Sequence, residues 1–253
     1  MFSQTAKTWN PDRALLEKSL DLLYSIPFPE KEVQLFLQEY RTAGCPMVSH
    51  SEKYRSCYRP AYRIVHMEYV SLLPILCSID KLLENEEFVM VAIDGPCASG
   101  KSTLGKKLSE LYHCPLISMD DFFLRPEQRT PARLAEIGGN VDYERFREEV
   151  LVPLTAGQEV SYRPFSCSTF TLAEPITLPR KALTIIEGTY SLHPHFGDCY
   201  DLMICLTVSP EVQRQRILLR PEFLHRRFFE EWIPMENRYF ETFGISEKCH
   251  LVL

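Results

Sequence analysis

The sequence predicts a three-layer α/β fold, a parallel sheet with helices on both faces, preceded by a mostly helical segment. Short apolar runs recur from residue 86 onward, and such uninterrupted runs are typical of strands that are buried on both faces. Segments with apolar residues at helical spacing separate these runs, and strands that alternate with helices indicate a parallel sheet. Before residue 86, apolar residues recur mainly at helical spacing.

The strands expected in this sheet cover residues 88–93, 115–118, 182–186, 202–208 and 250–253. The first of them, FVMVAI, is apolar throughout and is bounded by charged residues and then by glycine. Helices are expected over residues 104–112 and 142–154. Residues 159–178 alternate between polar and apolar side chains, which predicts a small antiparallel excursion. In the N-terminal segment, helices are expected over residues 11–24, 33–40 and 61–83.

The composition argues against several classes of protein. An apolar share of 45% is enough for a buried core, and 253 residues allow one large domain with an appendage. The net charge of −6 provides no general attraction to nucleic acid or to anionic membranes. The longest apolar stretch, residues 70–79, is about half of what a membrane-spanning helix needs, and it contains Pro74.

The nine cysteines are scattered, and no CxxC pair occurs among them. This pattern argues against a disulfide framework and a structural zinc site, and it is typical of reduced thiols in a cytosolic protein. No signal peptide is visible at the N-terminus. We therefore expect a cytoplasmic protein that works neither on nucleic acid nor at a membrane.

Residues 95–102, GPCASGKS, match the phosphate-binding pattern GxxxxGK[ST], and Thr103 follows. An apolar strand precedes the match and a helix follows it, which is the context that this loop requires to aim its amides at phosphates. Lys101 can reach the β- and γ-phosphates, and the Ser102 hydroxyl can ligate Mg²⁺. The sequence therefore predicts ATP or GTP with Mg²⁺ as cofactors. The residues expected to bind the nucleotide are Gly95, Pro96, Cys97, Ala98, Ser99, Gly100, Lys101, Ser102 and Thr103.

Two adjacent carboxylates, Asp120 and Asp121, follow the second expected strand in the segment SMDDFF. A parallel sheet binds its ligands at the carboxyl ends of its strands, so a carboxylate there can accept the proton of an attacking hydroxyl. Neighbouring residues point in different directions. We expect one of the two to act on the acceptor and the other to cap a helix or support the metal shell, and an Asp-Asp helix cap or turn is the structural alternative.

Several segments taken in order, GPCASGKST, SMDDFF, GGNVDYERF, YRPFSCS, IIEGTYSLH and RQRILLR, resemble the uridine kinase/phosphoribulokinase branch of P-loop kinases. The strongest resemblance is to bacterial uridine kinase-like proteins, and it runs from about residue 86 to the C-terminus. It implies a P-loop kinase domain over residues 86–253, with residues 1–85 as a helical N-terminal segment. The reaction it implies is ATP-dependent phosphorylation of a nucleoside, with the 5′-hydroxyl of uridine or cytidine as the first candidate.

The resemblance also implies roles for residues around the phosphates. Asp120 matches the catalytic aspartate, and Glu187 matches the carboxylate beside the Mg²⁺ shell. Arg216 and Arg220 match arginines of the lid helix that close on the phosphates and the acceptor, and their spacing of four places them on one face of a helix. With Lys101 they form a set of cations where the transition state spreads negative charge.

On the acceptor side, the resemblance implies that Phe123 lines the site, that Asp142 binds the ribose hydroxyls, and that Tyr162 lies near the base. Cys167 stands where the uridine kinase pattern has a histidine that helps to read the base, and Arg163-Pro164 replaces an acidic-aromatic pair. A thiol is a weak hydrogen-bond partner, so the resemblance supports the reaction type more strongly than the acceptor's identity.

Alternatives remain open at this stage. The same transfer could reach another riboside, a vitamin-like compound or a sugar phosphate, and a nucleotide-binding regulatory protein is a rival from another class. The histidines of HPH, at 193 and 195, are interpreted as loop residues, and Gly138-Gly139 as a hinge or turn. The expected partners are a small-molecule acceptor and a nucleoside triphosphate, and a homo-oligomer is allowed. Arginines that could form a phosphate-facing lid or a solvated helix face are Arg125, Arg129, Arg133, Arg214, Arg216, Arg220, Arg226 and Arg227.

Overall fold

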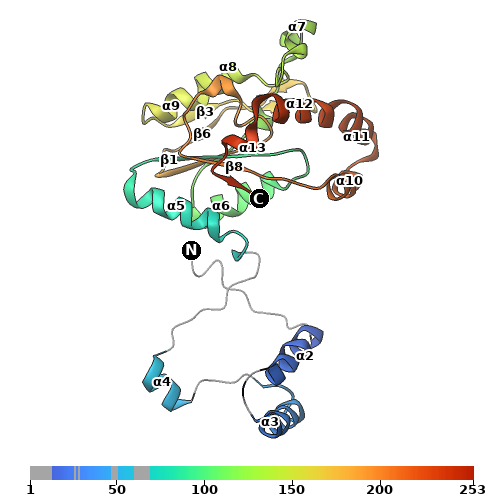
Figure 1. Cartoon of the computed structure of the whole chain (residues 1–253). Helices are drawn as coiled ribbons and strands as arrows, with labels where there is room; N and C mark the ends of the chain where they lie inside the picture. Colours follow the sequence, from blue (N-terminus) through green and yellow to red (C-terminus); the bar gives the residue numbers. More distant parts are fainter. Residues whose placement is uncertain (1–12, 26, 28, 47–50, 60–68) are drawn as a thin grey trace. The chain divides into compact units, whose positions relative to one another are not determined.

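The computed structural model describes residues 13–25, 27, 29–46, 51–59 and 69–253 (Figure 1). The chain divides into two compact units, Met1–Ser71 and Leu72–Leu253. Residues 72–85, grouped by sequence with the N-terminal segment, thus cluster with the α/β part of the chain. Parts of two expected helices, residues 11–12 and 61–68, lie outside the described residues.

The described part of the first unit is mostly helical, as predicted, although one of its helices, over residues 52–58, lies outside the predicted ranges. Its elements are α2 (Arg13–Asp21), the short 3₁₀ turn η1 (Leu22–Ser25), α3 (Glu30–Thr42) and α4 (Glu52–Tyr58). Leu20, Val33 and Leu37 form a small apolar cluster between α2 and α3. Arg41 on α3 adds ion pairs to two carboxylates of α2, at 2.9 Å from Glu17 and 3.2 Å from Asp21.

The second unit is built on a parallel sheet in the order β2-β7-β1-β8-β9. Its strands are β1 (Val89–Asp94), β2 (Leu116–Ser118), β7 (Leu183–Glu187), β8 (Leu202–Cys205) and β9 (Leu251–Val252). Every neighbouring pair is parallel. These strands overlap the predicted ones, and the predicted α/β fold is confirmed.

The alternation of side chains along β1 shows why a continuous apolar run was needed. Val89, Val91 and Ile93 belong to the core on one face of the sheet, whereas Met90 belongs to the core on the other. Successive side chains of a strand point to opposite faces, so a strand that is covered on both sides must be apolar at every position.

Helices cover both faces of this sheet (Figure 1). On one face, α5 (Leu73–Asn85) and α6 (Lys101–Tyr112) supply the buried residues Ile75, Ile79, Leu104 and Leu108. The other face is covered by the helical run α8 (Tyr143–Phe146), η5 (Arg147–Leu151) and α9 (Val152–Thr155), together with α12 (Ile233–Phe243) and α13 (Ile245–Lys248). The arrangement is the predicted three-layer fold.

Smaller elements complete the unit. The predicted antiparallel excursion is present as two short pairs, β3 (Val160–Tyr162) with β6 (Ile176–Leu178) and β4 (Phe165–Ser166) with β5 (Thr171–Leu172). The remaining short helices are η3 (Met119–Phe122), η4 (Pro126–Gln128), α7 (Pro131–Ala135), η6 (Pro194–Phe196), α10 (Pro210–Leu218), α11 (Glu222–Arg227) and the π-turn η7 (Phe228–Trp232). In the described residues, we find no helix with the length and apolar character needed to cross a bilayer.

The position of β1 determines where a ligand can bind. The chain leaves β1 for β2 on one side of the sheet, and it later crosses from β7 to β8 on the other side of β1. In open α/β sheets, ligands bind at the carboxyl ends of the strands where the connections diverge in this way. The loop that follows Asp94 lies at this point.

The membership of α5 in the core can be tested by substitution. Ile79 is fully buried, whereas Leu73 on the same helix is 51% exposed. We expect Ile79→Ala to lower the free energy of unfolding by roughly 2–5 kcal/mol because it leaves a cavity under the sheet. The control Leu73→Ala should change it by about 0.5 kcal/mol. Denaturant titrations in which both variants behave alike would remove α5 from this core.

Candidate active site

The loop from β1 to α6 has the backbone of a phosphate cradle. The backbone has positive φ values at Gly95 (147°), Ala98 (59°) and Gly100 (110°). Residues other than glycine rarely adopt this region. A Cβ atom at Gly95 would also lie 2.5 Å from the Leu206 carbonyl oxygen, so this position requires glycine on steric grounds as well.

Several amides of this loop have no acceptor in the described part of the chain. Three amides are used internally: Gly95 donates to Asp94, Cys97 to Glu236 and Ser99 to the Pro96 carbonyl. The remaining amides belong to the loop and to the first turn of α6, where helical geometry leaves the N–H groups unpaired. They are the amides of Ala98, Gly100, Lys101, Ser102 and Thr103. Such a row of donors at a helix N-terminus binds anions.

Lys101 lies in this cradle without a carboxylate partner. Its side chain is buried, and its Nζ donates to the Pro96 carbonyl oxygen at 2.9 Å. It makes no ion pair in the described part of the chain, although its charge lowers the pKa values of Asp120, Glu187 and Glu236. A buried ammonium group held only by a carbonyl is suited to bind a polyphosphate.

Glu187 and Ser102 meet at the edge of the cradle. The Glu187 carboxylate accepts hydrogen bonds from Ser102 Oγ at 3.0 Å and from Ser118 Oγ at 2.9 Å. The parallel register explains this contact, because Glu187 pairs with Ile93 of β1 and Ser118 of β2. Burial raises the pKa of Glu187, and the two serine hydroxyls oppose the shift. Hydroxyl and carboxylate oxygens are the donors that Mg²⁺ prefers beside substrate phosphates, so this pair fits the metal.

The two adjacent aspartates have different environments. Asp121 accepts a hydrogen bond from the Tyr162 hydroxyl at 2.8 Å. Asp120 makes no hydrogen bond or ion pair within the described residues and is reached by solvent. Nearby protein atoms nevertheless desolvate it and raise its pKa, while the charges of Lys101 and Arg220 oppose the shift. Asp120 is therefore the carboxylate that is available to a ligand.

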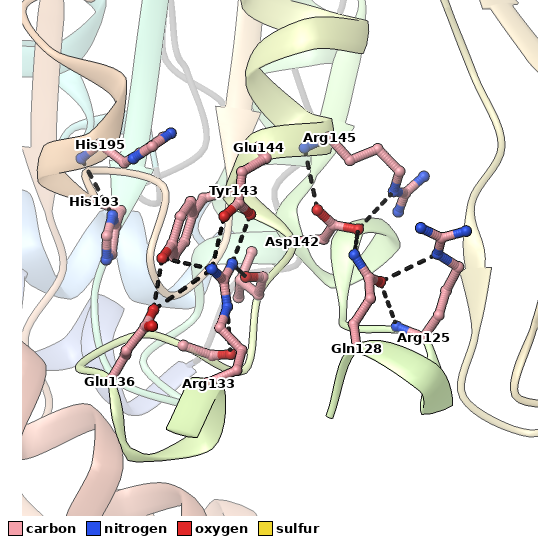
Figure 2. A network of polar contacts seen from close by, with 12 residues as sticks. Arg125, Gln128, Arg133, Glu136, Asp142, Tyr143, Glu144, Arg145, His193 and His195 are labelled. Carbon is pink, nitrogen blue, oxygen red and sulfur yellow. Dashed lines mark hydrogen bonds and ion pairs between the residues drawn. The ribbon is translucent and has the colours of Figure 1, made fainter. Parts of the chain in front are cut away.

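Asp142 and Tyr162, two residues expected on the acceptor side, already have partners within the protein. Asp142 is 2% exposed and accepts from Gln128 Nε2 at 2.7 Å and from the Arg145 amide at 3.1 Å (Figure 2). Its carboxylate also lies 3.7 Å from Arg145 Nε. Tyr162 is 3% exposed and packs on Phe122, with ring centroids 4.9 Å apart.

Phe123 and Cys167 are placed closer to Asp120. Phe123 is partly buried and pairs with Val141 through an isolated bridge, directly after η3, which contains Asp120. Cys167 is exposed in the turn between β4 and β5. Burial by nearby atoms raises the pKa of its thiol, and so does the negative charge of Asp120, whereas Arg129 opposes the shift. The structure therefore brings Phe123 and Cys167 to the Asp120 side of the site.

The two predicted lid arginines do not share a helix. Helix α10 ends at Leu218, so Arg220 lies beyond it, and the expectation that both occupy one helical face is wrong. Arg216 Nη1 donates to the carbonyl oxygens of Ala98 at 2.8 Å and Ser99 at 3.2 Å. The Arg220 guanidinium lies over the Phe228 ring, 4.9 Å from its centroid, and its charge reaches Asp120.

Arg133 belongs to a network of polar contacts with Glu136, Tyr143 and Glu144 (Figure 2). Its guanidinium binds Glu144 at 2.6 Å, lies 3.7 Å from the centroid of the Tyr143 ring and donates to the Gly139 and Val141 carbonyls. The His193 ring stacks on the Tyr143 ring, with the two ring centroids 4.8 Å apart. These contacts fix the Gly138-Gly139 turn.

Two carboxylates near the cradle were not identified from the sequence. Asp94 is the last residue of β1 and is fully buried, and Glu236 on α12 is 6% exposed. A carboxylate at the end of an apolar strand, or beside aromatic residues on a helix face, is the signal that could have pointed to them. Apart from Gly95, which follows Asp94, their partners are far away in sequence, so these contacts could not be foreseen.

Comparisons with known proteins support the fold. No protein-family model matches the chain, and no curated protein matches its sequence. Among solved structures, a possible uridine kinase from Bacillus stearothermophilus aligns with a TM-score of 0.56 at 19% identity, covering 74% of this chain and 100% of that one. Shikimate kinase from Acinetobacter baumannii in complex with shikimate aligns with a TM-score of 0.35 at 18% identity, covering 66% and 84%. The first likeness shows that the chain has a three-layer α/β P-loop fold.

The desolvated charge of Asp120 predicts a pH-dependent cost in stability. Because the pKa of Asp120 is raised above its ordinary value of 3.8, the folded state binds this proton more tightly than the unfolded chain does. The stability that the protonated group contributes is therefore complete below about pH 3.8 and is lost as the pH rises through the raised pKa. We expect Asp120→Asn to raise the melting temperature at pH 7, with a gain that shrinks toward pH 4.

The control for this measurement is Asp198→Asn, which removes a carboxylate from an exposed position outside the site. Thermal melts of both variants and the parent protein at several pH values provide the comparison. A melting temperature of Asp120→Asn equal to or below that of the parent at pH 7 would contradict the assigned environment.

Proposed function

We propose that this chain is a small-molecule kinase that transfers the γ-phosphoryl group of ATP or GTP to a hydroxyl group of its acceptor. The observation that carries this proposal is that a carboxylate without a partner accompanies the unpaired amides of the phosphate cradle. Asp120 has a carboxylate with no partner in the described chain, within reach of the charges of Lys101 and Arg220. A phosphate cradle together with a carboxylate on its acceptor side is what transfer to a hydroxyl requires.

In the proposed reaction, the unpaired amides from Ala98 to Thr103 hold the phosphates. Lys101 exchanges its contact with the Pro96 carbonyl for a contact with the β- and γ-phosphates. Asp120 orients the acceptor hydroxyl and takes its proton as the oxygen bonds to the γ-phosphorus. The bond between the γ-phosphorus and the bridging oxygen breaks, and ADP or GDP leaves. Arg216 and Arg220 stabilise the charge that spreads over the phosphoryl oxygens.

Ser102 and Glu187 would hold Mg²⁺, directly or through its waters. When bound, the metal neutralises part of the charge of the triphosphate. Ser118 keeps the Glu187 carboxylate in place through its hydrogen bond of 2.9 Å.

Uridine or cytidine is the first candidate acceptor, on the strength of the sequence resemblance and of the name of the structural neighbour. Under this assignment, Asp142 would bind the ribose hydroxyls, and Tyr162, Phe123 and Cys167 would surround the nucleoside. All nine cysteines are free thiols, which fits a kinase of the cytoplasm. Neither nucleic acid nor a membrane is a partner in this proposal.

A second candidate acceptor is favoured by the contacts of Asp142 and Tyr162. Asp142 would have to release Gln128 before it could bind a ribose, and Tyr162 would have to release Asp121. An exposed thiol at Cys167 also offers little to a pyrimidine base. These observations favour the same transfer to another acceptor, such as a different riboside, a vitamin-like compound or a sugar phosphate.

The test of the proposal is Asp120→Asn, assayed for acceptor-dependent release of ADP. Asparagine cannot accept the hydroxyl proton, so we expect turnover to fall by at least about a hundredfold, while the affinity for Mg·ATP changes little. Asp121→Asn is the matched control, because the Asp121 carboxylate is already bound to the Tyr162 hydroxyl, and we expect a smaller loss of turnover. Near-normal turnover of Asp120→Asn would remove this residue from its role.

A panel of acceptors separates the remaining alternatives. Uridine, cytidine, other ribosides, vitamin-like hydroxy compounds and sugar phosphates are compared by ADP release at saturating Mg·ATP. Turnover with uridine or cytidine alone identifies a nucleoside kinase, and turnover with another member identifies the second candidate. Nucleotide binding without turnover on any member would favour a regulatory protein.

A further inference from the structure

One face of α12 contacts the phosphate cradle from behind. Glu236 Oε2 accepts a hydrogen bond from the Cys97 amide at 2.7 Å, and the Tyr239 hydroxyl donates to Asp94 Oδ2 at 2.8 Å. Glu236 and Tyr239 are three positions apart, so they lie on the same side of the helix. Glu236 is 6% exposed, and Asp94 and Tyr239 are fully buried. These bonds are therefore largely shielded from water. In such surroundings a hydrogen bond to a charged group is stronger than it is in water.

Asp94 extends this contact to the loop after β7. Its carboxylate also accepts from the amides of Gly95 at 2.7 Å, Tyr190 at 3.2 Å and Leu192 at 2.9 Å. The same buried group thus joins the start of the cradle, the loop after β7 and helix α12. None of these partners is adjacent to another in sequence except Asp94 and Gly95.

The carbonyl side of the same short segment is held by α10. Gln213 Nε2 donates to the Cys97 carbonyl oxygen at 3.0 Å, and Arg216 donates to the carbonyls of Ala98 and Ser99. Cys97 is therefore held at its amide by α12 and at its carbonyl by α10. The part of the chain from α10 to α12 also contains Arg220, so the segment that carries the lid arginines is joined to the cradle at both ends.

The charge of Glu236 argues that its role is structural support of the loop. A buried carboxylate beside an anion site repels phosphate. The charged groups that face it are Lys101, which lowers its pKa, and Asp94, which raises it, while burial is the largest influence and raises it. Since the charge itself opposes nucleotide binding, the hydrogen bond to Cys97 is the favourable contribution that remains.

We propose that Glu236 is a positioning residue that holds the Cys97 peptide, and with it the unpaired amides of the cradle, in the geometry that binds phosphate. Tyr239 and Asp94 provide a second attachment on the same helix face. The ligand in this inference rests on the proposed function, because that proposal supplies the nucleoside triphosphate. The hold on the loop itself does not depend on it.

The first test measures amide hydrogen exchange of the peptide spanning residues 95–103 in the full chain without nucleotide. Glu236→Ala removes the acceptor, and we expect exchange of the hydrogen-bonded amides in this peptide, those of Gly95, Cys97 and Ser99, to accelerate about tenfold or more. Glu236→Gln keeps an oxygen acceptor without the charge and should restore protection. Glu241→Ala, on an exposed position of the same helix, is the control and should leave exchange unchanged. Unchanged protection of the cradle in Glu236→Ala, or acceleration throughout the unit, would overturn the inference.

Tyr239→Phe provides a second variant that keeps the buried ring. It removes the hydroxyl that donates to Asp94, and we expect faster exchange at Gly95 with the remaining core still protected. If Glu236→Ala does not fold, the inference is tested by Tyr239→Phe and Glu236→Gln instead. Protection of the cradle equal to that of the parent in Tyr239→Phe would then contradict the second attachment, and loss of protection in Glu236→Gln would contradict a role based on the hydrogen bond.

The second test is equilibrium binding of Mg·ADP, without acceptor. Glu236→Ala should weaken binding about tenfold, whereas Glu236→Gln should bind as tightly as the parent or more tightly, because it lacks the repelling charge. Tighter binding by Glu236→Ala would show that the charge dominates and would overturn the inference. A parent protein that binds no nucleotide would contradict the proposed function instead, and the exchange measurement would still decide the role of Glu236.

Discussion

The pairing of β1 with β7 on one side and β8 on the other is the constraint on which the site depends. It places the end of β1 next to Glu187 and Leu206, so the cradle begins where both neighbouring strands end. The register aligns Ile93 with Glu187. A shift by one residue would point the Glu187 side chain to the other face of the sheet, into an apolar core. The apolar packing on both faces fixes that register, and the chemistry of the site follows from it.

Around this edge, polar groups fall into two classes. Asp142, Tyr162, Arg133 and Asp121 have partners within the described chain and support the loops that surround the site. Asp120 and a row of amides at the start of α6 lack partners there and are available to a ligand. Unsatisfied groups that gather at the carboxyl end of a parallel sheet are the physical sign of a ligand. They support the proposed function more strongly than any single motif does.

The inferred support by α12 explains how a strained loop can be maintained. Ala98 has a positive φ of 59°, which is unfavourable for a residue with a side chain, and the cradle needs its contacts to keep that conformation. Glu236 accepts from the Cys97 amide, and Arg216 donates to the Ala98 carbonyl oxygen. Since both helices belong to the C-terminal part of the chain, the geometry of the phosphate site depends on residues more than a hundred positions away.

The sequence by itself determined the sheet, the cradle and the candidate aspartates, because these depend on local patterns. A strand buried on both faces must be continuously apolar, and a phosphate loop must contain glycine at fixed spacing. The tertiary structure alone decided which aspartate is unpaired, that Asp142 is already bound to Gln128, and that Arg220 lies beyond the end of α10. It also decided that Glu236 holds Cys97. Each of these depends on contacts between residues distant in sequence, and such contacts leave no pattern in a single chain.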